Sequence, residues 1–146
     1  MKQIFLILLL ILVLVTGCAK NNSPENTGEN AIADTKAENI LDGLNTEDYE
    51  TFSRDLSDNV KESMNEEAFS RLGIFIKDNS GDYVTKTLAA SKDENNMHTM
   101  SYDCQFSLES VFLTITFNED YSMVEGIYFD SENMRAALAQ NLDFAK

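Results

Sequence analysis

The sequence predicts an α+β domain in which several helices are followed by an antiparallel sheet of about four strands and a final helix. Three observations lead to this prediction. Apolar residues recur every three to four positions between residues 31 and 80. Between residues 83 and 129 they alternate with polar residues, and short polar turns separate the runs. A helical spacing returns after residue 131. Helices that precede consecutive hairpin-linked strands are typical of the α+β class.

The helical half divides into three segments. The first has Asp34 or Thr35 as its expected N-cap and ends at residues 45–46. Its apolar face comprises Ala33, Ala37, Ile40, Leu41 and Leu44. The second places Tyr49, Phe52 and Leu56 on one face. The third begins at Asn65, a favoured N-cap residue, and ends in the turn sequence of residues 78–81.

Four runs of the second half have the period of a strand. They are residues 83–90, 99–108, 111–117 and 123–129. The alternation is strict in the second run, which places Met100, Tyr102, Cys104, Phe106 and Leu108 on one face. We expect one face of the sheet to pack on the helices and the other to be more polar.

The last segment, residues 131–144, predicts a C-terminal helix. Ser131 is its expected N-cap. The apolar residues Met134, Leu138 and Leu142 share one face of this helix. We therefore expect it to pack against the rest of the domain through that face.

The N-terminus combines one basic residue with a short apolar run that ends near a cysteine. Lys2 precedes uninterrupted apolar residues from Ile4 to Val15. This run is shorter than the about 20 residues of a membrane-spanning helix, and it has the length of a signal peptide's apolar region. Val15-Thr16-Gly17-Cys18 resembles the lipobox of prokaryotic lipoproteins. The resemblance implies that the Cys18 sulfur receives a diacylglyceryl group with fatty chains such as palmitate, and that cleavage makes Cys18 the first residue. The alternative is an uncleaved anchor with an incidental cysteine.

These features divide the chain into three parts. Residues 1–17 form the predicted lipoprotein signal peptide, residues 18–30 the acylated cysteine and a flexible tether, and residues 31–146 a single α+β domain. The tether has no large apolar side chain and contains the only proline of the chain. Because two acyl chains give stable attachment, we expect the domain to be anchored at the extracytoplasmic face of the cell membrane.

Composition argues against several classes of function. The chain has 25 acidic and 11 basic residues, and its net charge is −14 at pH 7. Nucleic acid phosphates would repel such a chain. One histidine and two cysteines are too few for a typical zinc site or a disulfide framework. We therefore expect no nucleic acid partner, no metal and no cofactor.

Two segments of the predicted domain carry a family resemblance. They are residues 38–49, with the sequence ENILDGLNTEDY, and the pair of runs at residues 112–117 and 124–129. Both resemble parts of nuclear-transport-factor-two-like (cystatin-like) domains, and the arrangement is similar to small domains of unknown function in secreted prokaryotic lipoproteins. The resemblance covers about residues 35–130. It implies a curved sheet wrapped around a long helix, so that the two form a cone with a cavity.

The same resemblance indicates where catalytic residues would lie. Enzymes of that superfamily usually carry acid and base side chains inside the cone. His98 follows a polar turn, which favours a surface position, and Asp103 alternates with the apolar face and should point outward. Cys104 has no predicted histidine partner and should be a free thiol. We therefore predict no catalytic residues.

Three neighbouring residues are candidates for lining the cone cavity. Tyr102, Cys104 and Phe106 share the apolar face of one predicted strand, where they would contact a ligand. Ordinary core packing is the simpler interpretation, because buried cysteine and aromatic residues are normal core components.

Three functional hypotheses follow. The first, which we favour, is a non-catalytic domain of a membrane-anchored lipoprotein that binds a small apolar ligand or an envelope protein. The second is a cone-fold enzyme, of isomerase or hydrolase type, that acts on a small apolar substrate. The third is a structural accessory domain of an envelope complex. The acidic stretch at residues 47–58 is most simply a solvated helix face.

Overall fold

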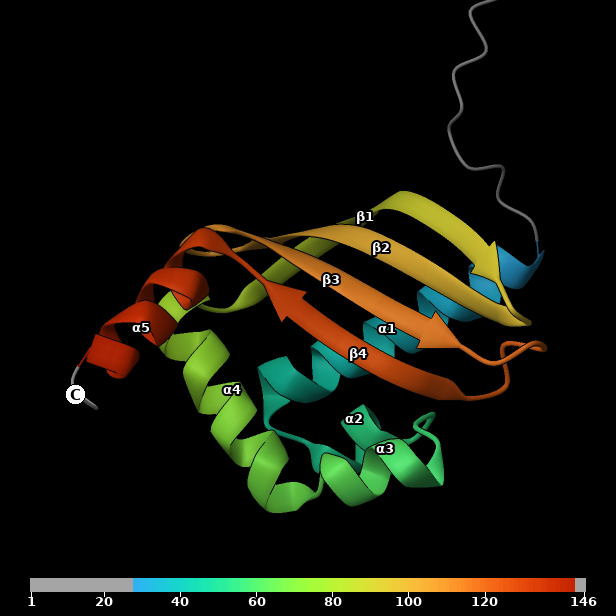
Figure 1. The fold of residues 1–146 in the computed structure, drawn as a ribbon, viewed down its shortest axis with the longest axis horizontal. Helices are drawn as coiled ribbons and strands as arrows, with labels where there is room; N and C mark the ends of the chain where they lie inside the picture. Colours follow the sequence, from blue (N-terminus) through green and yellow to red (C-terminus); the bar gives the residue numbers. More distant parts are fainter. Residues whose placement is uncertain (1–27, 144–146) are drawn as a thin grey trace, which may run out of the picture.

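The computed structural model describes residues 28–143, which form one antiparallel sheet with helices packed against it (Figure 1). The elements are α1 (Gly28–Thr46), α2 (Tyr49–Ser53), α3 (Asp58–Ser63), α4 (Glu66–Ser80), β1 (Tyr83–Glu94), β2 (Met97–Phe106), β3 (Ser110–Phe117), β4 (Val124–Asp130) and α5 (Glu132–Asp143). This order confirms the predicted α+β class. The predicted signal peptide and Cys18 lie outside the described residues. Within residues 28–143, no helix is both long and apolar enough to cross a membrane.

The sheet is a four-stranded meander that curves over α1. Each strand pairs antiparallel with the next one along the chain, in the order β1-β2-β3-β4. The register shifts within β1 between Tyr83 and Thr85 and between Leu88 and Ala90. It also shifts where Thr116 and Phe117 of β3 pair with Gly126 and Val124 of β4. Such irregularities bend strands and increase their twist. They therefore account for part of the curvature seen in Figure 1.

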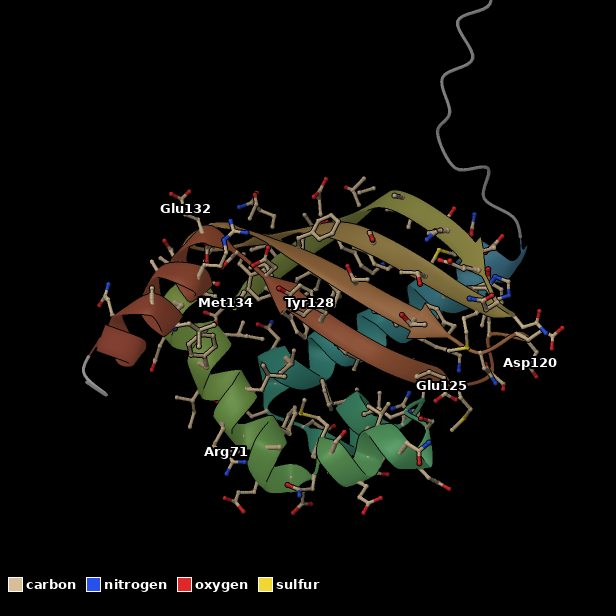
Figure 2. All side chains as sticks on the ribbon, viewed as in Figure 1. Arg71, Asp120, Glu125, Tyr128, Glu132 and Met134 are labelled. Atoms are coloured by element: carbon tan, nitrogen blue, oxygen red, sulfur yellow. The ribbon has the colours of Figure 1, made fainter. Side chains whose placement is uncertain are left out.

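The predicted alternation of β2 and β3 is confirmed. The inward residues, each at most 3% exposed, are Met100, Tyr102, Cys104, Phe106, Val111, Leu113, Ile115 and Phe117. Leu108 was predicted on this face, but it follows the end of β2 and is 66% exposed. The outer face is more polar, although Tyr128 stands on it and is exposed (Figure 2).

Helix α1 supplies the other side of the core. Its buried residues are Ala33, Ala37, Ile40, Leu41 and Leu44, as the spacing predicts. The helix begins earlier than predicted, at Gly28, so that residues 28–30 of the expected tether are helical. Asp34 and Thr35 therefore lie inside α1 and do not cap it. The sequence pattern misplaced the start because apolar spacing marks only the part of a helix that contacts the core.

The predicted second helix stops short of Leu56, because α2 ends at Ser53, and the short helix α3 that follows was not predicted. Between α2 and α3, the chain forms a parallel bridge from Leu56 to Val124 of β4. The Val124 N–H donates to the carbonyl of Asp55 at 2.8 Å, and the Ser57 N–H donates to the carbonyl of Val124 at 2.9 Å. These bonds draw the backbone out of helical geometry while keeping Leu56 fully buried.

Helices α4 and α5 have the predicted N-caps. The Asn65 side chain accepts a hydrogen bond from the Ala68 N–H at 3.1 Å, and the Ser131 hydroxyl accepts one from the Met134 N–H at 3.2 Å. Helix α4 ends at Ser80 and is followed by Gly81, whose φ of 83° favours glycine. Met134 is buried, as its position on the predicted apolar face of α5 implied, whereas Leu138 is 54% exposed.

Candidate functional site

The three residues predicted to line a cavity lie on the inner face of β2. Tyr102 is 1% exposed, Cys104 is 0% exposed and Phe106 is 3% exposed. Phe106 borders a small pocket of about 20 Å³, which neither of the other two residues reaches. Burial raises the pKa of the Cys104 thiol to about 12, despite the opposing charge of Lys86. The thiol therefore stays protonated at neutral pH, and a protonated thiol is a poor nucleophile.

A buried lysine lies next to these residues and faces α1. Only 6% of the Lys86 side chain is exposed, and its Nζ lies 2.6 Å from Asp34 Oδ1 and 3.1 Å from Glu38 Oε2. The same Nζ is 5.3 Å from the centre of the Tyr102 ring, within cation–π range. The ammonium group thus joins β1 to α1 through two carboxylates.

Tyr83 completes this polar cluster. Its hydroxyl donates to the Glu38 carboxylate, at 3.1 and 3.2 Å from the two oxygens. Burial, followed by the charge of Glu38, raises the pKa of the Tyr83 phenol. Burial likewise raises the pKa of the Tyr102 phenol. These charged and polar groups satisfy one another, which is the arrangement of a structural tie between helix and sheet.

The two other residues considered from sequence lie apart from this cluster. His98 is near the β1–β2 turn, where its Nδ1 is 2.6 Å from Asp93 Oδ1 and its Nε2 is 3.0 Å from the carbonyl of Glu119. Its ring stacks on that of Tyr121, with centroids 4.2 Å apart. Asp103 is exposed on the outer face of β2. The structure therefore does not bring His98 and Asp103 together.

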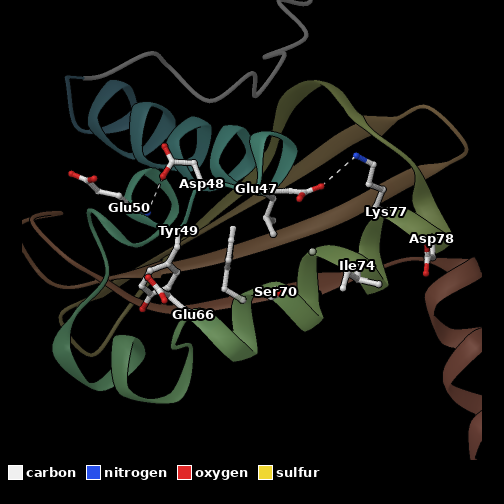
Figure 3. A pocket seen from close by; sticks show the side chains of 12 residues that line it. Glu47, Asp48, Tyr49, Glu50, Glu66, Ser70, Ile74, Lys77 and Asp78 are labelled. Carbon is white, nitrogen blue, oxygen red and sulfur yellow. Dashed lines mark hydrogen bonds and ion pairs between the residues drawn. The ribbon is translucent and has the colours of Figure 1, made fainter.

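A larger concave site lies on the helical side of the domain, between α4 and the corner where α1 meets α2 (Figure 3). This groove has a volume of about 570 Å³, which is within the usual range of ligand pockets. Its apolar lining comprises Leu44, Tyr49, Phe69, Gly73 and Ile74. Its polar lining comprises Glu47, Asp48, Glu50, Glu66, Ser70, Lys77 and Asp78. We call this site the α1–α4 groove.

Hydrogen bonds of Asp48 hold the corner between α1 and α2, which forms one wall of the groove. The Asp48 N–H donates to the carbonyl of Gly43 at 2.8 Å. The Asp48 carboxylate caps α2 by accepting from the N–H groups of Glu50 and Thr51, and from the Thr51 hydroxyl at 2.6 Å. These hydrogen bonds, chiefly the one from the Thr51 hydroxyl, lower the pKa of the Asp48 carboxyl. Asp48 is therefore an ionised structural cap at neutral pH.

The aromatic floor of the groove is equally well fixed. The Tyr49 hydroxyl donates to the carbonyl of Met64 at 3.0 Å, which ties α2 to the end of α3. The Tyr49 and Phe69 rings are tilted, with centroids 5.5 Å apart, and Phe69 packs on Phe52 at 4.8 Å. Because these rings are locked by their neighbours, the groove is preformed.

The charge of the groove is strongly acidic. Five carboxylates border it, against the single ammonium of Lys77. Lys77 already pairs with Glu47 at 3.8 Å and with Asp82 at 3.5 Å. Among the residues that the structure describes, Glu50, Glu66 and Asp78 have no ion-pair partner. These three carboxylates are therefore available to a cation.

Sequence reasoning did not find this site. Its two walls are separated in sequence, and each wall by itself has the composition of a solvated helix face. The sequence of α4 contains two signals of the groove. Helical spacing places Glu66, Ser70, Gly73 and Lys77 on one face. A glycine in the interior of a helix, such as Gly73, often has a packing or functional reason. The described residues contain no group of three or more His, Cys, Asp or Glu side chains arranged to hold a metal ion.

Comparison with known proteins identifies one family. No curated protein and no solved structure matches the chain. The likeness to nuclear-transport-factor-two-like domains therefore remains a prediction from the sequence. A family model described as "Protein of unknown function (DUF3887)" matches residues 37–125, from the middle of α1 to the start of β4. That stretch is more than half of the chain and includes every residue of the groove. The chain belongs to the DUF3887 family.

Proposed function

We propose that this protein is a non-catalytic binding domain, anchored by lipid at the extracytoplasmic face of the membrane, and that the α1–α4 groove is its binding site. The observation that carries the binding proposal is the groove itself: a preformed hollow of about 570 Å³ with an apolar floor and unpaired carboxylates. Anchoring rests on the lipobox-like sequence that ends at Cys18. Binding at the groove needs no group from the buried core of the sheet.

The chemistry of the core supports a binding role over catalysis. Lys86, whose side chain is 6% exposed, is paired with two carboxylates of α1. The Cys104 thiol, with a pKa of about 12, is a poor nucleophile at neutral pH. A general acid or base needs access to substrate and a pKa close to the working pH. The Cys104 thiol has neither, and the Lys86 side chain is only 6% exposed.

Fragment binding followed by hydrogen–deuterium exchange tests the groove. The full chain, reconstituted in nanodiscs of zwitterionic lipid, is exposed to a library of small aromatic and aliphatic amines. We expect bound fragments to slow exchange in residues 44–50 and 66–78. In Gly73→Leu, a side chain fills the groove, and this protection should be lost. Fold should be retained, because a Cβ at Gly73 meets only Leu44 Cδ2, at 4.0 Å.

The matched control is Ala136→Leu, which adds the same side chain to an exposed position of α5. It should leave fragment protection unchanged. Protection located outside the groove, or equal protection in Gly73→Leu and wild type, would overturn the proposed site.

Anchoring has its own test. Expression of Cys18→Ala in a bacterial host should yield an unprocessed precursor without acyl chains, as measured by mass spectrometry of the intact protein. The wild-type chain should begin at an acylated Cys18. A wild-type product that retains Met1, or carries an unmodified Cys18, would contradict the anchor while leaving the groove proposal untouched.

A further inference from the structure

We infer that the α1–α4 groove binds an extended peptide segment of a partner protein, in which two basic side chains flank several apolar ones. This inference rests on the binding role proposed above and specifies the ligand. It is carried by the length of the groove, by the positions of its unpaired carboxylates and by its apolar middle.

The groove is elongated along α4. Its lining runs from Glu66, the first residue of the helix, to Asp78, near its end. Twelve residue steps at about 1.5 Å each give a length of about 18 Å. An extended chain advances about 3.3 Å per residue, so five or six residues span this distance. A single small amine would occupy only one end.

The unpaired carboxylates lie toward the two ends of this groove. Glu66 is beside Tyr49 at one end, with Glu50 on the adjoining helix α2 (Figure 3). Asp78 is at the other end, one helical turn beyond Ile74. Lys77 does not neutralise them, because it pairs with Glu47 and Asp82. The arrangement is complementary to two positive charges held apart by the length of the groove.

Between these ends the floor is apolar. Phe69 and Leu44 form its base, and Ile74, 60% exposed, forms part of its wall. Gly73 presents no side chain, so a ligand approaches the backbone of α4 closely at this point. The Ser70 hydroxyl, exposed at the centre and without a hydrogen-bond partner among the described residues, is available to a peptide carbonyl or N–H. Apolar side chains between two basic ones match this surface.

A linear polyamine also carries separated positive charges, but it fits the groove less well. A polyamine is a thin chain, and it would leave most of the volume of about 570 Å³ and the apolar floor empty. Burial of apolar surface is the main favourable term in association. A peptide with bulky apolar side chains gains that term, so the volume favours the peptide.

Fluorescence anisotropy with matched peptides tests the inference. The probe is a labelled hexapeptide with arginine at both ends and leucine and phenylalanine between them. Its twins carry glutamine or glutamate in place of arginine. With the full chain in zwitterionic nanodiscs, and empty nanodiscs as the blank, we expect the arginine peptide to bind at least tenfold more tightly than the glutamate twin. Its affinity should fall as sodium chloride is added.

Substitutions at both ends of the groove test which carboxylates bind the basic side chains of the peptide. The double substitution Glu66→Gln with Asp78→Gln should lower the affinity for the arginine peptide by roughly threefold to tenfold. It should leave the affinity for the glutamine twin unchanged. The control, Glu62→Gln with Glu132→Gln, removes two exposed carboxylates outside the groove. It should change the affinity for neither peptide. Circular dichroism checks that each variant is folded.

The outcomes separate this inference from the broader proposal. Equal binding of the three peptides, equal weakening by the control pair of substitutions, or displacement of the arginine peptide by equimolar spermine would overturn the peptide assignment. If the amine fragments still protect the groove in a manner that Gly73→Leu abolishes, the binding role stands and only the ligand class is wrong. If fragments also fail there, both proposals fall.

Discussion

At the scale of single residues, Gly43 decides how closely α1 and α2 approach. A Cβ built on Gly43 would lie 2.5 Å from the backbone nitrogen of Phe52 and 2.7 Å from its Cα. Both are backbone atoms, which cannot move aside as the end of a flexible side chain would. The absence of a side chain therefore permits the tight corner that also forms one wall of the groove.

Substitution of this glycine should be costly. We expect Gly43→Ala to lower the free energy of unfolding by about 3 kcal/mol, because overpacking forces α2 away from α1. Urea denaturation measures the change. Gly73→Ala is the matched control: its Cβ has space, and the gain in helix propensity should raise stability by up to about 1 kcal/mol. Similar effects at the two sites would contradict the steric argument.

Asp55 is a second residue whose environment is set by distant partners. It accepts hydrogen bonds from Lys36 Nζ at 2.7 Å and from Asn39 Nδ2 at 2.8 Å, and Lys36 also donates to the carbonyl of Ser122. Burial raises the pKa of the Asp55 carboxyl, but the hydrogen bonds from Lys36 and Asn39 outweigh it, and the net shift is downward. The ionised form is therefore favoured in the folded state.

This shift gives a pH dependence of known sign. Because the folded pKa lies below the unfolded value of about 3.9, the contribution is complete above about pH 4 and disappears as pH falls through the folded pKa. We expect Asp55→Asn to cost about 1 kcal/mol at pH 7 and to be closer to wild type at pH 2 to 3. Thermal unfolding across this pH range measures the difference in stability between the variant and wild type. If the exposed control Asp58→Asn showed the same pH-dependent loss of stability, the assignment to Asp55 would be wrong.

Among the interactions between elements, one carboxylate links the start of α5 to the rest of the domain, beside the buried Met134 side chain and a hydrogen bond from Asn133 Nδ2 to the carbonyl of Asn79 at 3.0 Å. Glu109, in the turn between β2 and β3, accepts from the hydroxyls of Ser80 and Ser131, both at 2.6 Å, and from the Asn133 N–H at 3.1 Å. Although burial opposes ionisation, these bonds lower the pKa of the Glu109 carboxyl. A negative charge at the N-terminus of α5 also interacts favourably with the helix dipole.

Loss of this carboxylate should release α5 selectively. In Glu109→Ala we expect amide exchange in residues 132–140 to accelerate by roughly tenfold, with much smaller changes in β2 and β3, because the lost bonds join α5 to the sheet. Hydrogen exchange with mass spectrometry resolves the two regions. Glu132→Ala, an exposed change in the first turn of α5, is the control. Uniform acceleration throughout the domain would show that Glu109 supports the whole fold.

At the scale of the whole molecule, the excess of negative charge is the dominant electrostatic feature. The net charge is −14 at pH 7, and self-repulsion of this size opposes the compact state. Exposed ion pairs such as Arg71–Glu67 oppose that repulsion only weakly.

Salt should therefore stabilise this protein. As ionic strength rises from 0.01 to 0.1 M, the Debye length falls from about 30 to about 10 Å, which screens repulsion between distant carboxylates. We expect the midpoint of thermal unfolding to rise by about 4 °C, equivalent to on the order of 1 kcal/mol. Calorimetry in sodium chloride measures this rise. A fall in the midpoint would mean that ion pairs contribute more than the net repulsion removes.

Short-range patterns in the sequence predicted the inner face of the sheet, the buried face of α1 and two helix caps. The strict alternation from Met100 to Phe106 was sufficient to place the inner face of the sheet, because a strand exposes successive side chains on opposite faces. The spacing from Ala33 to Leu44 located the buried face of α1 for a similar reason. The caps at Asn65 and Ser131 were also predictable, since each acts on its own helix within three residues.

Other features depend on contacts between residues that are far apart in the sequence. The break between α2 and α3 depends on Val124, and the charge state of Asp55 depends on Lys36; both partners are distant in sequence. The α1–α4 groove likewise exists only where residues 44–50 meet residues 66–78. Periodicity reports which side of an element is buried, but a concave surface depends on how two elements are placed, and that placement is set by long-range packing.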